Sequence, residues 1–71
     1  MEDKIIKVME RVFKVAVDKN IEQNICAEWD SLRHLNLIIE LEQEFNVNFE
    51  PEEISEMTSF NSILEILKVK I

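Results

Sequence analysis

Residues 29–60 read WDSLRHLNLIIELEQEFNVNFEPEEISEMTSF, and this stretch decides the fold. Near its start, the carboxylate of Asp30 can accept a backbone N–H from the first turn of a helix that begins at Ser31. Apolar residues then recur at helical spacing as far as Phe45. Their wide sector predicts a helix at the centre of the domain that packs on several neighbours. They are Leu35, Leu37, Ile38, Ile39, Leu41 and Phe45.

Two further helices are predicted after this one. Asn46 can end the central helix because asparagine tolerates the left-handed conformation, and the chain contains no glycine to do so. Residues 50–54, EPEEI, predict a short helical turn with Pro51 at its first helical position. Thr58 or Ser59 can cap a last helix over residues 60–69.

The residues before Trp29 supply one more helix and one long connection. Residues 3–17 carry apolar side chains at helical spacing and predict an amphipathic helix. Residues 18–29 form the connection, and its apolar residues predict that it lies against the bundle. These are Ile21, Ile25, Cys26 and Trp29. We therefore expect an all-α, four-helix up-and-down bundle with three main helices and a short third one, in a single domain over residues 1–71.

The composition excludes several kinds of site. The chain has 71 residues, of which 46% are hydrophobic, which is enough for a small core and argues against disorder. The absence of glycine excludes Gly-dependent phosphate loops and nucleophile elbows. A single His and a single Cys exclude the usual zinc site and an internal disulfide. We expect no metal site, and we expect Cys26 to be a buried or half-buried small hydrophobe.

The charge is acidic and uneven. The net charge is −7, and no basic residue lies between Arg33 and Lys68. Such a surface disfavours nucleic acid and anionic membranes and favours basic protein surfaces. No apolar run is long enough to span a membrane, and the first residues indicate an amphipathic helix rather than a signal peptide. We expect a cytoplasmic monomer without membrane insertion.

The order of parts resembles the acyl carrier protein family. The resemblance lies in a long helix, a long loop, Asp30-Ser31-Leu32 opening a second helix, a short third helix and a final helix. LEQEF at residues 41–45, PEEI at 51–54 and MTS at 57–59 resemble further parts of the family pattern. The resemblance covers essentially the whole chain and is strongest between residues 29 and 59.

The resemblance implies a carrier that is not itself an enzyme. A phosphopantetheinyl transferase would move 4′-phosphopantetheine from coenzyme A onto the hydroxyl of Ser31. The thiol of this arm would hold acyl intermediates as thioesters for acyl-loading and acyl-processing enzymes with basic surfaces, in a fatty-acid, polyketide-like or other specialised pathway. The unpaired N–H groups and partial positive charge at a helix N-terminus suit an attached phosphate. Leu32 would be part of an apolar collar, whereas we expect Trp29 to pack the loop onto the bundle.

Partner recognition is expected from residues around Ser31 and on the acidic short helix. The sequence departs from typical fatty-acid carriers, because Arg33 and Asn36 stand where those carriers have acids. This change in charge favours a specialised carrier with dedicated partners, the alternative being two merely solvated polar residues. Glu28 stands where the family often has a small residue. The expected recognition residues are Asp30, Leu32, Arg33, Asn36, Glu40, Glu52 and Glu53.

Other functions stay open at this point. One is a carrier of amino-acyl or peptidyl groups, and another is an unmodified acidic helical adaptor in which Ser31 only begins a helix. A catalytic dyad of Ser31 and His34 lacks an orienting group and an oxyanion hole, so we expect His34 at the rim of the core. The resemblance also implies that the apolar linings of the last three helices can part around an acyl chain. Those linings include Ile38, Ile54, Ile63 and Leu67.

Overall fold

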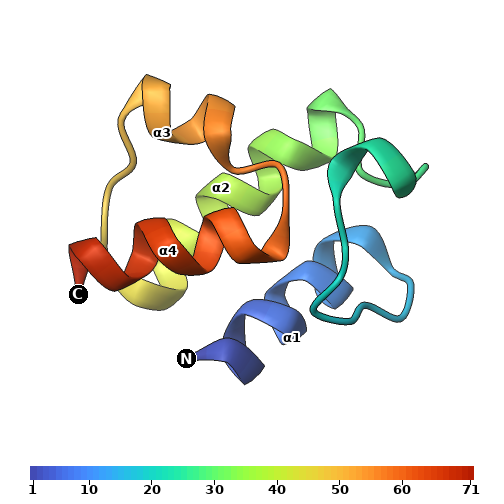
Figure 1. The fold of residues 1–71 in the computed structure, drawn as a ribbon, viewed down its shortest axis with the longest axis horizontal. Helices are drawn as coiled ribbons and strands as arrows, with labels where there is room; N and C mark the ends of the chain where they lie inside the picture. Colours follow the sequence, from blue (N-terminus) through green and yellow to red (C-terminus); the bar gives the residue numbers. More distant parts are fainter.

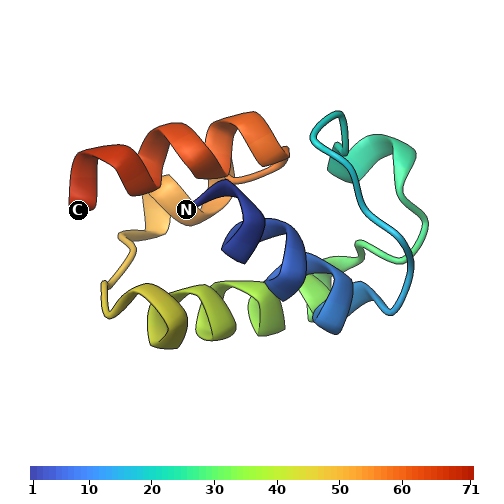
Figure 2. The same ribbon diagram turned by 90° about the horizontal axis from the view of Figure 1, so that it is seen from below.

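The computed structural model describes residues 1–71 and is an all-α bundle of four helices, as predicted. Successive helices run in opposite directions, and α3 is much the shortest (Figures 1 and 2). A 3-10 turn, η1, lies in the long connection between α1 and α2. The elements are α1 (Glu2–Phe13), η1 (Gln23–Ile25), α2 (Ser31–Phe45), α3 (Pro51–Glu56) and α4 (Phe60–Lys70).

The helix ends follow from local side chains. Asp30 Oδ1 accepts the Arg33 N–H at 2.8 Å and so caps α2, as predicted. Asn46 ends α2 in the left-handed conformation with φ 54°, which confirms its role in place of glycine. Ser59, rather than Thr58, caps α4.

The first helix is shorter than predicted. It ends at Phe13, and the expected end at Val17 is wrong. Lys14 adopts the left-handed conformation with φ 61°, and the Val17 N–H donates to the Glu10 carboxylate at 3.1 Å, which turns the chain back. Val15 and Val17 are β-branched, so their helix propensity is also lower than that of unbranched residues. The connection to α2 therefore spans residues 14–30.

Backbone bonds hold this connection to the segment between α3 and α4. The Gln23 N–H donates to the Thr58 carbonyl at 2.8 Å, and the Phe60 N–H donates to the Ile21 carbonyl at 3.1 Å. The pair forms one isolated antiparallel bridge and no strand. The connection therefore lies against the bundle, as predicted.

Trp29 anchors the end of the connection in the core. Its side chain is 2% exposed, and its ring lies 5.0 Å from that of Phe13, measured between centroids. This confirms the expectation that Trp29 packs the loop onto the bundle. Ile25 is an exception to the buried connection, since it is 70% exposed.

The buried core takes apolar side chains from α1, α2, α4 and the loops, and α3 adds only the half-buried Ile54. α1 packs against α2 and α4, and α3 packs against α4. The expectation for Leu35 and Ile39 is wrong, because they are 56% and 51% exposed. In a bundle this small, only one face of α2 meets other helices. The buried residues are Ile5, Val8, Met9, Phe13, Trp29, Leu37, Ile38, Leu41, Phe49, Met57, Phe60, Ile63, Leu64 and Leu67.

The short helix α3 is fastened to the end of α4. Lys70 Nζ lies 2.9 Å from Glu53 Oε1, and the same ammonium lies 5.7 Å from the centroid of the Phe49 ring. Glu53 Oε1 also accepts the Glu50 N–H at 2.7 Å. The Glu50 N–H and the Lys70 ammonium hold the pKa of Glu53 below its ordinary value.

Candidate functional site

Ser31 is the first residue of α2, and its side chain is exposed. The exposure matches what a serine modified by another enzyme needs. Asp30 takes the Arg33 N–H, whereas the N–H groups of Ser31 and Leu32 have no partner within the chain. The start of α2 therefore offers two open N–H donors and the positive end of a 15-residue helix beside the Ser31 hydroxyl.

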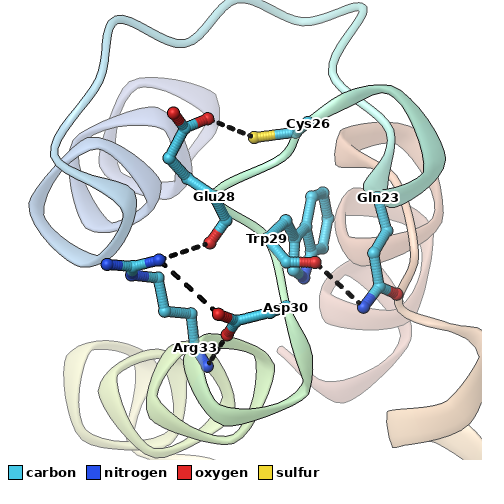
Figure 3. A network of polar contacts seen from close by, with 6 residues as sticks. All are labelled: Gln23, Cys26, Glu28, Trp29, Asp30 and Arg33. Atoms are coloured by element: carbon cyan, nitrogen blue, oxygen red, sulfur yellow. Dashed lines mark hydrogen bonds and ion pairs between the residues drawn. The ribbon is translucent and has the colours of Figure 1, made fainter.

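Side chains on both sides hold the backbone that leads into Ser31 (Figure 3). Arg33 Nη1 donates to the Glu28 carbonyl at 3.3 Å and lies 3.6 Å from Asp30 Oδ2. From η1, Gln23 Nε2 donates to the Trp29 carbonyl at 3.3 Å. Two consecutive carbonyl groups before the cap are thus bound by side chains, which fixes the approach to Ser31.

Glu28 is accommodated in this loop without strain. The only positive φ angles in the chain belong to Lys14 and Asn46, so the position of Glu28 does not require a small residue. Its carboxylate accepts a bond from the Cys26 thiol at 3.7 Å. Cys26 is half-buried, as predicted, and lies in the same network (Figure 3).

The expected recognition residues differ in how free they are. Arg33 is engaged by Glu28 and Asp30, Glu40 Oε1 accepts a bond from Arg11 Nη2 at 2.6 Å, and Glu53 is paired with Lys70. The other four lie on the surface, with Asp30 serving as the cap of α2. Three of them make no side-chain hydrogen bond or ion pair within the chain, and these are Leu32, Asn36 and Glu52.

Sequence reasoning missed an exposed apolar stripe on α2, formed by Leu32, Leu35 and Ile39. Their exposed fractions are 70%, 56% and 51%. Spacings of three and four residues place them on one face of the helix, which begins beside Ser31. At about 100° per residue these positions lie opposite Leu37 and Leu41, so the sequence shows two apolar faces, but only the structure shows that the face of Leu37 and Leu41 is the buried one.

His34 lies at the rim of the core, as predicted, but it does not bond to Ser31. Trp29 Nε1–H donates to His34 Nδ1 at 3.0 Å, and His34 Nε2 lies 2.9 Å from the Ile54 carbonyl oxygen. Both ring nitrogens are therefore occupied by partners other than the Ser31 hydroxyl. The His34 ring therefore links Trp29 to Ile54 and is not placed as a base for the Ser31 hydroxyl.

None of the hollows of the surface opens between α2, α3 and α4. The groove with the most apolar lining, about 420 Å³, follows the connection between α1 and α2 and is lined by Val17, Ile21, Ile25 and Cys26, among others. None of the three hollows opens among the side chains expected to part around an acyl chain. Ile63 and Leu67 are fully buried there. Parting of these linings stays a prediction.

No model of a known protein family matches the chain, and no curated protein matches it significantly. None of the helices combines the length and the apolar character needed to cross a bilayer.

Proposed function

We propose that this chain is an acyl carrier protein and that Ser31 carries a 4′-phosphopantetheine arm. The observation that carries the proposal is an exposed serine as the first residue of a long helix, with unpaired N–H groups beside it. A phosphodiester at this oxygen would be negative, and the positive end of α2 would stabilise it. The family resemblance of Asp30-Ser31-Leu32 in its sequence context supports the same assignment.

The attachment is a phosphoryl transfer. Ser31 Oγ forms a bond to the phosphorus that bears pantetheine in coenzyme A. The pyrophosphate P–O bond breaks, adenosine 3′,5′-bisphosphate leaves, and a base of the transferase takes the hydroxyl proton. The carrier contributes a positioned hydroxyl, and its anchored loop lowers the ordering cost of binding. The arm would then hold acyl groups as thioesters at high effective concentration for partner enzymes.

The stripe of Leu32, Leu35 and Ile39 is the surface that we propose for partner enzymes. It begins next to Ser31 and lies on the exposed side of α2. Because Arg33 is turned into its own loop, the case for dedicated partners depends mainly on Asn36 and on this stripe. The same surface would serve a carrier of amino-acyl groups.

An unmodified adaptor is the second candidate, and the exposed stripe favours it. Three exposed apolar side chains on one helix face fit binding to another protein, whether or not Ser31 is modified. In that function, the acidic surface would select a basic partner. The two candidates differ in whether Ser31 becomes covalently modified.

Intact mass spectrometry distinguishes the candidates. The purified protein is incubated with coenzyme A, magnesium and a promiscuous phosphopantetheinyl transferase. The expected result is a gain of one phosphopantetheinyl group by the wild type and by Ser55→Ala, an exposed serine on α3, and no gain by Ser31→Ala. No gain by the folded wild type, beside a control carrier that is modified, would reject the carrier function and leave the adaptor.

A further inference from the structure

His34 lies in the first turn of α2, and its ring bonds to two other segments. The Trp29 indole N–H donates to Nδ1 at 3.0 Å, and the Ile54 carbonyl oxygen lies 2.9 Å from Nε2. An indole N–H can only donate and a carbonyl can only accept, so Nδ1 is the acceptor and Nε2 carries the hydrogen. The two partners therefore assign one tautomer to the ring, with both nitrogens bonded.

The first of these bonds holds the backbone before Ser31. Trp29 is two residues before Ser31, is 2% exposed and packs against Phe13. The His34 backbone N–H also donates to the Asp30 carbonyl at 2.8 Å. His34 thus contacts two residues that precede Ser31: its side chain contacts Trp29 and its backbone contacts Asp30. These two bonds restrain the backbone on both sides of Ser31.

The second bond reaches α3. A helix of six residues is too short to be stable by itself, so α3 depends on its neighbours. The Ile54 carbonyl accepts from His34 on α2, and Glu53 pairs with Lys70 on α4. Of these two contacts, only the one with His34 connects α3 to the first turn of α2, where Ser31 lies.

We infer that His34 is a positioning residue, which fixes the backbone leading into Ser31 and ties that backbone to α3. Its effect on rate rests on the proposed modification of Ser31, whereas its two hydrogen bonds are measurable without it. Loss of the imidazole ring leaves the buried indole N–H of Trp29 and the Ile54 carbonyl without these partners. The backbone before Ser31 then becomes more mobile. A small displacement of a reacting hydroxyl lowers the rate of transfer steeply.

The test compares His34→Phe with His34→Gln. Phenylalanine keeps a ring but makes neither bond, whereas the glutamine amide keeps one acceptor and one donor. The measurements are hydrogen exchange of the single indole N–H by NMR, and kcat and KM for arm transfer to Ser31. For His34→Phe, we expect indole exchange faster by about tenfold and kcat lower by about tenfold, with KM within about twofold. For His34→Gln, we expect kcat within about threefold of the wild type, because both bonds can form again.

Two results would overturn the inference. One is indole exchange in a folded His34→Phe variant that equals the wild type, and the other is an equal loss of kcat in both variants. If His34→Phe does not fold, Trp29→Phe removes the indole donor together with part of the buried ring, and an unchanged kcat in that variant would also overturn the inference. If the wild type accepts no arm, the proposed function fails, and indole exchange alone decides whether His34 holds Trp29.

Discussion

Replacing Asp30 tests how α2, and with it Ser31, is held in place. The Asp30 carboxylate accepts the Arg33 N–H at 2.8 Å, and replacing such a cap by alanine costs about 1 kcal/mol in the free energy of unfolding. The ion pair with Arg33 adds little, because its atoms are 3.6 Å apart and both side chains are about half exposed. For a 71-residue domain, a loss of about 1 kcal/mol lowers Tm by about 7 °C.

Asp30→Asn is the matched control for Asp30→Ala. Both variants lose one negative charge, so repulsion within the acidic chain changes equally in each. Asparagine caps helices about as well as aspartate, and the difference of about 1 kcal/mol between the two variants therefore isolates the cap. Urea unfolding followed by circular dichroism and by Trp29 fluorescence measures it. Equal stability of the two variants would refute the assignment of Asp30 as the cap that sets the start of α2.

Three further outcomes follow from burial and charge. Leu41→Ala removes a fully buried side chain and should lower the free energy of unfolding by about 2–5 kcal/mol, measured in urea. Ile39→Ala, at a position 51% exposed, should change it by less than about 0.5 kcal/mol. Similar losses in the two variants would contradict the assignment of one buried and one exposed apolar face to α2. The pKa of Glu53 lies below its ordinary value of 4.5, because Glu53 accepts the Glu50 N–H and pairs with Lys70. Because the pKa of Glu53 is lower in the folded chain, its ionised form stabilises the fold at pH values above the unfolded pKa, and this stabilisation is lost as the pH falls through the folded pKa. Glu53→Gln removes this pH dependence and should flatten the drop in Tm below about pH 4.5. Because the net charge is −7, added salt should raise Tm from its low-salt value by screening repulsion, and a Tm that falls would count against this.

Local chemistry made most of the fold predictable. Asp30, Asn46, Pro51 and Ser59 act within one helical turn of where they stand, so their effects can be read from neighbouring residues alone. The error at the end of α1 has a longer range. There, Glu10 bonds to the Val17 N–H seven residues away, a contact that helical periodicity does not describe.

The candidate site was predictable in its centre but not in its surroundings. Ser31 stands at the start of a capped helix, and that placement depends on a short stretch of sequence. The partners of Arg33, Glu40 and Glu53 come from the loop, from α1 and from α4. A residue that looks free for a partner in the sequence can thus be occupied within the chain, because long side chains pair across helices that pack together.

The sequence by itself determined the number and order of the helices, the cap of α2, the net acidic charge and the position of Ser31, since each follows from residue type and local spacing. Only the tertiary structure decided which apolar face of α2 is buried, because a bundle of this size covers one face and leaves Leu35 and Ile39 in solvent. It also decided that His34 joins Trp29 to Ile54. The physical reason is distance along the chain: residues 20 positions apart meet only when α2 and α3 are packed in one bundle.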